Sequence, residues 1–444
     1  MMTNKLILFF TILSALLFCA HASLSAQQHG NPLLPHIVPL ESCLPKDTIS
    51  TKEHEVLSAL FNGARVIGLG EATHGTHEIF TMKHRLIKFL VQSKGFKLIG
   101  LEAGMPEVEV VNRYILSDEG SSSALLAVYQ LGMWSVGNYE MLDLVQWLYH
   151  FNQQQTEKNK VRICGFDVQM TDSAVRTVTR FLRRVNPQYA ATLLNTENCY
   201  QWLTANSTMT AQNIWTYQAD SVKQHYISNA DSVLYHFERY RKQYEKATSS
   251  KECAWAQRNA WLVSRAVRLF SSTKTRDSSM AENVSWLMKY FKQDKIILSA
   301  HNGHVWCENH TASNSDATMG WYLREKYAQE YFAVALTANT GTYSAVHEGV
   351  LRRNNTILLP STTNHLENYL HRAAIPQGFI NLRAIQPTDA SFPWFSRLQA
   401  MRFIGSVVLP TQFGYTYLLK NFDAIVFIDS TIASNPLPDF SRMR

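Results

Sequence analysis

Short apolar runs that alternate with helical patterns are the feature of this sequence that most limits its fold. The helical patterns of the first third place apolar residues three and four apart, at residues 78–92, 106–116 and 139–151. The apolar runs lie at residues 65–70, 97–102, 161–166, 295–300, 331–338 and 423–428. Because the strands that these runs predict are apolar on both faces, we expect an α/β fold with a mainly parallel central sheet covered by helices.

The middle of the chain departs from this alternation. Residues 173–291 carry helical patterns with hardly any strand candidate. We therefore predict an α/β core formed by residues 46–172 and 292–444, with a large helical insertion at 173–291. Residues 27–45 contain four prolines and predict an extended lead-in to this core.

The first 26 residues have the pattern of a secretory signal peptide. Lys5 precedes the apolar stretch Leu6–Leu17, and small residues follow that stretch. The stretch is too short to predict a stable membrane span. We therefore expect a periplasmic or secreted protein. A lipid anchor on Cys19 is the less favoured alternative, because Phe18 stands where lipidation needs a small residue.

Composition and charge exclude some classes of protein. The chain is 46% hydrophobic and 17% charged, which is typical of globular proteins and not of disordered ones. Its formal net charge of +7 is spread thinly, with no basic run of the kind that binds nucleic acid. We therefore expect a small-molecule partner and no nucleic acid.

The cysteines do not suggest a metal or redox site. Those that remain beyond the signal peptide are widely spaced, at Cys43, Cys164, Cys199, Cys253 and Cys307. Two interpretations of these cysteines are open. Cys199 and Cys253 form one disulfide, or the cysteines are buried free thiols.

The glycine-rich segment Gly68–Gly75, GLGEATHG, follows the first apolar run. Its glycine spacing differs from the dinucleotide-binding fingerprint, and it lacks the Gly-Lys-Ser/Thr of a phosphate loop. The carboxylate of Glu71 would repel a phosphate. We expect the glycines to allow a tight turn that presents Glu71 and His74 to a site.

Chemically reactive side chains follow four of the predicted strands. Because ligands bind where the carboxyl ends of parallel strands meet, these side chains predict one common site. They are Glu71 and His74, Glu102, Asp167, and the pair His301 and His304. For Asp167, capping of the next helix is an equally open interpretation.

Taken together, several segments resemble the erythromycin esterase family from about residue 50 to residue 430. They include VIGLGEATHG at 66–75, LEAG at 101–104, GFD at 165–167, AHNGH at 300–304 and FDAIVF at 422–427. The resemblance implies an α/β protein with a helical insertion that hydrolyses an ester or lactone, with a macrolide antibiotic as one candidate substrate and antibiotic resistance as its role.

The resemblance also implies roles for particular residues. His74 would be the general base that activates water, and Glu71 would orient it. Glu102, His301 and His304 would complete the catalytic cluster. A neutral imidazole with a pKa of ~6.5 suits proton abstraction near neutral pH. The serine-esterase motif G-x-S-x-G is absent from the sequence, so a serine nucleophile is not expected.

One departure from the family pattern concerns the helix after the histidine loop. Where the macrolide-inactivating members have an arginine, this chain has Lys83, with Arg85 two residues later. Lysine keeps the charge but lacks the planar fork of arginine. We expect Lys83, Arg85 and Asp167 to contact substrate.

Two alternatives use the same residues. Imidazoles and carboxylates also suit a divalent metal, which would make the protein a metal-dependent hydrolase, whereas the preferred interpretation needs no cofactor. Histidines also ligate haem iron, so a periplasmic haem-binding or ligand-binding protein is the alternative from another class.

Overall fold

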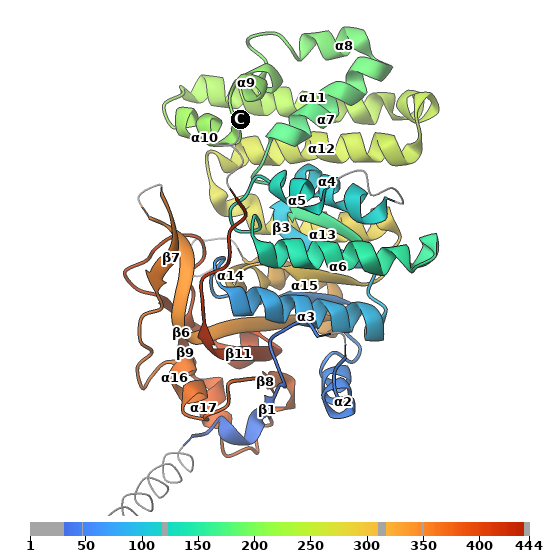
Figure 1. Ribbon diagram of the computed structural model, residues 1–444. Coiled ribbons are helices and arrows are strands. Elements are labelled where there is room, and N and C mark those ends of the chain that lie inside the picture. Colours follow the sequence, from blue (N-terminus) through green and yellow to red (C-terminus); the bar gives the residue numbers. More distant parts are fainter. Residues whose placement is uncertain (1–30, 47, 118–122, 310–316, 348–349, 439–444) are drawn as a thin grey trace, which may run out of the picture.

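A nine-stranded mixed sheet forms the centre of the computed structural model (Figure 1). The structure describes residues 31–46, 48–117, 123–309, 317–347 and 350–438, so the predicted signal peptide lies outside the described residues. The strands are β1 (Ile37–Pro39), β2 (Val66–Leu69), β3 (Leu98–Gly104), β4 (Arg162–Asp167), β5 (Ile296–Ser299), β6 (Tyr331–His347), β7 (Val350–Ile357), β8 (Gln377–Asn381) and β11 (Ala424–Thr431). A separate hairpin pairs β9 (Leu398–Arg402) with β10 (Phe413–Tyr417).

The strand order is β1-β8-β11-β6-β2-β5-β3-β4, with β7 paired to β6. All pairs from β11 to β4 are parallel. The antiparallel pairs lie toward the other edge, between β1 and β8 and between β8 and β11, and in the β6–β7 extension. The predicted α/β class with a mainly parallel sheet is therefore confirmed.

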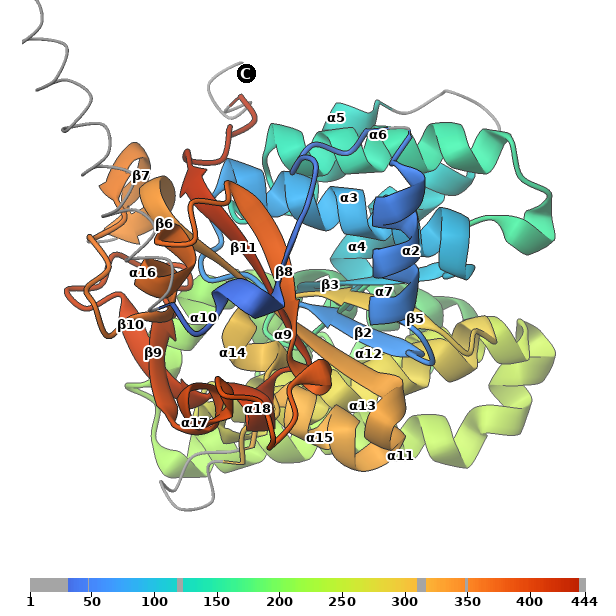
Figure 2. The ribbon, with the colours of Figure 1, turned by 90° about the horizontal axis from the view of Figure 1, so that it is seen from below.

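Helices cover both faces of the sheet, as the view from below shows (Figure 2). Helices α3 and α6 lie on one face, and α13 and α15 lie on the other. The helices that precede or flank the sheet are α2 (Thr51–Leu60), α3 (His77–Lys94), α4 (Met105–Leu116), α5 (Ala124–Tyr129), α6 (Tyr139–Gln153), α13 (Arg276–Phe291), α14 (Asn302–Val305), α15 (Met319–Tyr327), α16 (Leu366–His371), α17 (Phe392–Ser396) and α18 (Leu418–Asn421).

The strands are apolar on both faces because each face contributes to a separate core. Val66 and Leu98 belong to the core on one side of the sheet, together with residues of α13. Their neighbours Ile67 and Ile99 belong to the core on the other side, together with residues of α3 and α6. Successive residues of a strand point to opposite faces, so an uninterrupted apolar run supplies both cores.

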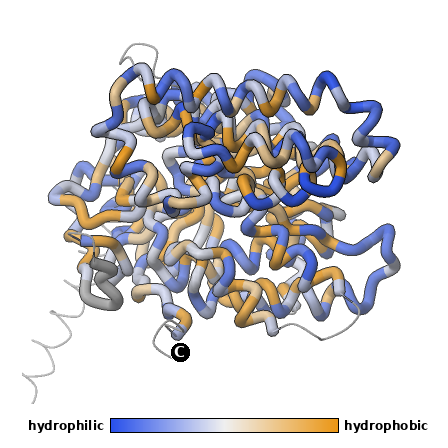
Figure 3. Tube along the Cα trace, turned by 90° about the horizontal axis from the view of Figure 1, so that it is seen from above, coloured by the Kyte–Doolittle hydropathy of each residue, from blue (hydrophilic) through white to orange (hydrophobic). Residues whose placement is uncertain are grey.

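A helical layer lies above one edge of this arrangement (Figure 1). It leaves the sheet after β4 and returns to it through α13. Along its helices, hydrophilic and hydrophobic residues alternate when the layer is viewed from above (Figure 3). Cys199 and Cys253 both lie in it as buried free thiols. Its helices are α7 (Asp172–Val185), α8 (Pro187–Thr192), α9 (Cys199–Ala205), α10 (Thr208–Trp215), α11 (Asp220–Ala247) and α12 (Ser250–Leu269). The predicted helical insertion is thus confirmed as a feature of the fold.

Some strands depart from the expected pattern. Strand β6 continues nine residues past the predicted end at residue 338, where it leaves the parallel sheet and pairs with β7. Strand β1 forms within the segment expected to be an extended lead-in, where it pairs with β8. Among the described helices, none is both long enough and apolar enough to cross a membrane.

The register of the parallel strands brings the candidate residues to one edge. Strand β5 lies between β2 and β3, and its last residue, Ser299, pairs with both Leu69 and Leu101. Strand β4 follows β3, with Gly104 opposite Asp167. The segments that follow these four strands therefore start side by side.

Candidate active site

The loop after β2 is held by close backbone packing. A Cβ atom on Gly75 would lie 2.0 Å from the carbonyl oxygen of Ser344, and one on Gly70 would lie 2.0 Å from Asn302 Oδ1. Neither glycine has a positive φ. The chain turns at His74 and Gly75 as expected, and the glycines are needed in addition for close approach of neighbouring segments.

Asn302 joins this loop to the sheet. Its side chain is fully buried, and its Nδ2 donates to the Leu336 carbonyl oxygen at 3.0 Å while Oδ1 accepts from the Leu336 N–H at 3.2 Å. Its backbone N–H donates to the Glu71 carbonyl oxygen at 2.8 Å. Asn302 thus fixes the segments that carry Glu71 and His301 relative to β6.

Glu71 and His74 form a carboxylate–imidazole pair. The Nδ1 atom of His74 lies 2.5 Å from Glu71 Oε1. The second carboxylate oxygen, Oε2, accepts a hydrogen bond from Lys83, whose Nζ also donates to Ser299 Oγ at 3.0 Å. Glu71 and Lys83 are buried, whereas 15% of the His74 side chain is exposed. The His74 Nε2 atom makes no hydrogen bond to the described residues, so it is free to meet a substrate or water.

The surroundings set the charges of this pair. Burial alone would raise the pKa of Glu71, but Lys83 and His74 outweigh it and lower that pKa to about 2. Burial likewise opposes protonation of His74, but its hydrogen bond to Glu71 and the charges of Glu71 and Glu102 raise its pKa above 6.5. Glu71 therefore stays ionised and favours a proton on the imidazole of His74.

His301 lies beside His74, with the ring centroids 5.4 Å apart. Burial and the charges of His74 and His304 lower the pKa of His301 to about 3. Its Nδ1 accepts from the Gly303 N–H at 3.2 Å, so the ring proton sits on Nε2, which lies 3.3 Å from the Ala72 carbonyl oxygen. His301 is thus a neutral imidazole that offers an N–H.

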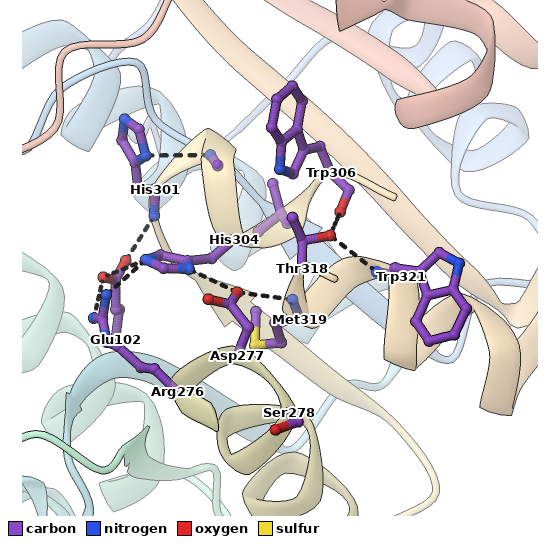
Figure 4. Close-up of polar contacts among 12 residues, drawn as sticks. Glu102, Arg276, Asp277, Ser278, His301, His304, Trp306, Thr318, Met319 and Trp321 are labelled. Carbon is purple, nitrogen blue, oxygen red and sulfur yellow. Dashed lines mark hydrogen bonds and ion pairs between the residues drawn. The ribbon is translucent and has the colours of Figure 1, made fainter. Parts of the chain in front are cut away.

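His304 lies between two carboxylates (Figure 4). Its Nδ1 is 2.8 Å from Asp277 Oδ1, and its Nε2 is 3.3 Å from Glu102 Oε1 and 2.9 Å from Arg276 Nη1. Glu102 Oε2 also accepts from the His301 backbone N–H at 2.8 Å. Glu102 therefore connects His304 to the segment that carries His301.

Arg276, the first residue of α13, completes this network. Its Nε and Nη2 donate to the two carboxylate oxygens of Asp167 at 3.1 and 2.9 Å, and Nη2 also donates to Glu102 Oε1 at 2.8 Å. Burial opposes the charge of Arg276, but Asp167 and Glu102 outweigh it and raise its pKa. The arginine thereby bridges the ends of β3 and β4.

The same charges act on His304 and Glu102. Burial disfavours the imidazolium of His304, but Glu102 and Asp277 outweigh it and raise its pKa to about 10. Burial also opposes the carboxylate of Glu102, but His304 and Arg276 hold its pKa well below the usual range. This half of the cluster is therefore a fixed ionic network, in contrast to the neutral ring of His301.

The structure thus brings together the five residues expected to be catalytic. Two ring contacts border the cluster: Trp134 meets His74 edge-on with centroids 6.5 Å apart, and Phe403 lies 6.1 Å from His301. The five residues are Glu71, His74, Glu102, His301 and His304.

The three residues expected to contact substrate do not lie together in one site. Lys83 joins the cluster, but it is buried and donates to Glu71. Asp167 holds Arg276 and does not cap α7, which begins five residues later. Arg85 lies away from the cluster, where its Nε donates to Glu53 Oε1 at 3.1 Å and its Nη1 to the Leu44 carbonyl oxygen at 3.0 Å. Residues two apart on a helix face different sides, so Lys83 and Arg85 cannot reach one site.

Sequence analysis missed Arg276 and Asp277. They lie at the start of a helix that follows the short 3₁₀ helix Thr273–Thr275, with no apolar run before them. A basic residue followed by an acidic one at a helix start is common, so the sequence carried no signal for their role.

The arrangement does not fit the divalent metal of the alternative interpretation. Across the part of the chain that the structure describes, no three His, Cys, Asp or Glu side chains are placed to hold one metal ion.

Comparisons with known proteins identify the family and the fold. The family model described as erythromycin esterase matches residues 91–431. The chain is 22% identical to erythromycin esterase type II of Escherichia coli over 406 residues, which cover 85% of this chain and 92% of that relative. A protein from Bacillus cereus of known crystal structure has a TM-score of 0.77 at 26% identity, covering 91% of this chain and 98% of that one. An erythromycin esterase mutant in its open conformation shares the fold, with a TM-score of 0.70 at 19% identity and coverage of 91% and 99%.

Proposed function

Because the chain belongs to the erythromycin esterase family, we propose that it hydrolyses a carboxylic ester or lactone with water activated by His74. The observation that carries this proposal is the pairing of His74 Nδ1 with Glu71 at 2.5 Å, which leaves Nε2 unpaired on a partly exposed ring. An imidazole oriented by a carboxylate in this way is suited to general-base catalysis.

The proposed reaction starts with water next to His74 Nε2. As the water oxygen attacks the ester carbonyl carbon, one of its protons passes to Nε2, and Glu71 stabilises the imidazolium that forms. The tetrahedral intermediate then breaks its bond to the alcohol oxygen, which takes the proton back from Nε2. The products are a carboxylic acid and an alcohol, which remain one molecule when the substrate is a lactone.

We propose that His301 stabilises the oxyanion. Its Nε2–H has only a long contact, 3.3 Å, to the Ala72 carbonyl oxygen, and its ring lies beside His74. A neutral imidazole can donate this hydrogen bond to the charge that develops on the carbonyl oxygen. The network of Glu102, His304 and Arg276 holds the His301 segment in place.

A macrolide lactone is our first candidate substrate, because erythromycin esterase type II of Escherichia coli is a relative over most of the chain. The replacement of the family arginine by Lys83 is a weaker argument against a macrolide substrate than the sequence suggested. Lys83 is 2% exposed and its ammonium group contacts Glu71, so we propose that it sets the charge of the base pair and does not grip the substrate.

The test compares His74→Ala with the wild-type protein. Each is assayed on a nitrophenyl ester, which reports release of nitrophenolate, and on erythromycin, where mass spectrometry reports addition of one water. We expect His74→Ala to keep the fold and to lose hydrolysis by ~10²-fold or more, the scale of a lost general base.

His225→Ala is the matched control, because His225 lies exposed on α11, far along the chain from the cluster. Hydrolysis that persists in His74→Ala would show that His74 is not the base. Hydrolysis of the nitrophenyl ester without any addition of water to erythromycin would keep the mechanism and reject the macrolide as substrate.

A further inference from the structure

A cavity of about 840 Å³ lies between α4, α7 and α12, and no residue of the catalytic cluster lines it. Its volume is within the range of small-molecule sites in proteins. The walls come mainly from α7, with α4 and α12 opposite. This cavity has no role in the proposed ester hydrolysis.

The charge of the cavity is unbalanced. Five arginines line it, against two glutamates. Arg184 pairs with Glu252, and Arg176 donates only to Ser173 Oγ, at 2.8 Å. The other glutamate, Glu109, is partly buried and accepts a hydrogen bond from Asn112 at 3.2 Å, so the arginines outnumber the acidic groups of the cavity.

The remaining arginines form no ion pair within the described structure. Arg113, Arg180 and Arg183 form no hydrogen bond or ion pair with any residue that the structure describes, and all three are exposed. They are therefore available to an anion from solution.

Helix α7 differs from its neighbour α11 in how its basic residues are paired with acidic ones. Arg176, Arg180 and Arg184 repeat every four residues on α7, a spacing at which like charges repel. On α11, Lys223 and Arg241 each pair with an acidic residue one turn away, Arg241 with Glu245 at 2.8 Å. The row therefore places like charges along one face of α7, and a bound anion would offset their repulsion.

The cavity also has an apolar part. Phe181 is buried beneath the arginines, and Trp255 of α12 and Leu194 line the same space. An inorganic anion would leave this part in contact with water. A ligand that combines an anionic group with an apolar body would cover it and contact the arginines at once.

We propose that this cavity binds an amphiphilic anion, in which one carboxylate, sulfate or phosphate group is carried on an apolar body. Arg180 and Arg183 bind the anionic group, and Leu194 and Trp255 pack against the body. The ligand is either a free small molecule or an anionic lipid headgroup, since both present this chemistry.

Two dyes with the same aromatic body test the proposal. Anilinonaphthalene sulfonate carries an anionic group, and phenylnaphthylamine lacks it. In fluorescence titrations of the full protein we expect one saturable site for the sulfonate and weaker binding of the neutral dye. The double variant Arg180→Gln/Arg183→Gln should weaken sulfonate binding about tenfold or more, because it removes two charged hydrogen-bond donors.

The control is Arg239→Gln/Lys242→Gln on α11, which removes the same charge from exposed positions outside the cavity. Circular dichroism checks that both double variants are folded. Equal loss of binding in both, or no loss in Arg180→Gln/Arg183→Gln, would overturn the proposal.

Sedimentation with vesicles separates the two ligand sources. Binding of the sulfonate together with arginine-dependent binding to phosphatidylglycerol vesicles, and not to phosphatidylcholine vesicles, would identify a lipid headgroup. Sulfonate binding alone would identify a free anion. Vesicle binding without sulfonate binding would overturn the proposal, because it would show an open charged surface and no cavity site.

Discussion

At the scale of single residues, the state of Glu71 determines what His74 can do. The Lys83 ammonium group is buried against Glu71, and together with His74 it keeps the pKa of that carboxyl at about 2. An ionised Glu71 raises the pKa of His74, whereas a protonated one would not. The base strength of His74 is thus set by the buried carboxylate of Glu71, for which we propose no contact with the substrate.

Replacing Glu71 with Gln tests this dependence through the pH profile of kcat/KM. In the wild type we expect activity to rise with pH as His74 loses its proton, at a pH above 6.5 because its pKa is raised. Glu71→Gln removes the carboxylate that raises this pKa, so the acid limb should move to lower pH. Its plateau should also fall by about 10²-fold, because the imidazolium loses its stabilising charge.

Glu238→Gln, a change on the exposed surface of α11, serves as the control for that profile. An acid limb that stays in place in Glu71→Gln would mean that a group other than His74 limits the rate.

The sequence predicted which side chains meet in the cluster better than it predicted the residues that support them. Glu71, Glu102 and His301 each follow an apolar run, so their position at one sheet edge could be inferred. Arg276 follows no strand, and it reaches Glu102 from 174 positions away in the chain. Such a contact depends on how the helical layer returns to the sheet, which no local pattern encodes. Arg85 was misplaced although its spacing from Lys83 already put the two on different sides of α3.

At the scale of elements, the loop after β2 is shaped by its neighbours. The carbonyl of Gly75 accepts from the N–H groups of Ser344 and Ser434, at 2.9 and 2.8 Å, and the His74 N–H donates to the Gly405 carbonyl at 3.2 Å. His74 therefore sits on a segment that three other segments hold.

Gly75→Ala should disturb both stability and activity. Its Cβ would lie 2.0 Å from the Ser344 carbonyl oxygen, a backbone atom that cannot rotate away. We expect the free energy of unfolding to fall by about 1–3 kcal/mol, the usual cost of overpacking, and kcat to fall as His74 shifts. Urea unfolding and ester hydrolysis measure the two effects.

Gly137→Ala is the comparison, because the nearest atom to its added Cβ, the Met133 carbonyl oxygen, lies 3.1 Å away. It should cost less stability than Gly75→Ala. Equal effects of the two substitutions would contradict the packing explanation.

The elements that sequence analysis found and missed differ in kind. The six parallel strands were recognisable because burial on both faces leaves continuous apolar runs, as in β2 and β11. Strands β8 and β10 are short and mix polar with apolar residues, so nothing separates them from loops. They become strands through pairing with segments distant in the chain, which local propensity does not predict.

At the scale of the whole molecule, buried histidines link stability to pH. His84 on α3 is 5% exposed, its Nε2 has no partner in the described structure, and burial, aided by Lys88, lowers its pKa to about 3. The unfolded chain binds a proton there near pH 6.5 and the folded chain does not. The stability tied to His84 is therefore present above pH ~6.5 and is lost progressively as the pH falls toward ~3.

Replacement of His84 with Leu isolates this contribution. Between pH 6.5 and 4.5 the free energy of unfolding should fall less steeply in the variant than in the wild type, by about 1.4 kcal/mol per pH unit, the value for one proton. Denaturant unfolding across this range gives both slopes. Identical slopes would show that His84 takes up its proton equally in the folded and unfolded chains.

The strand order also dictates how the molecule can assemble. Strand β11 is the last in the chain, yet it lies inside the sheet between β6 and β8, and β1 reaches the sheet only through β8. Strand β2 pairs with β5 and β6, more than 200 residues away. A growing chain therefore cannot close its sheet until residues up to Thr431 have been made, and contacts at such separation form slowly. The central sheet is therefore completed late, after its helical layer has been synthesised.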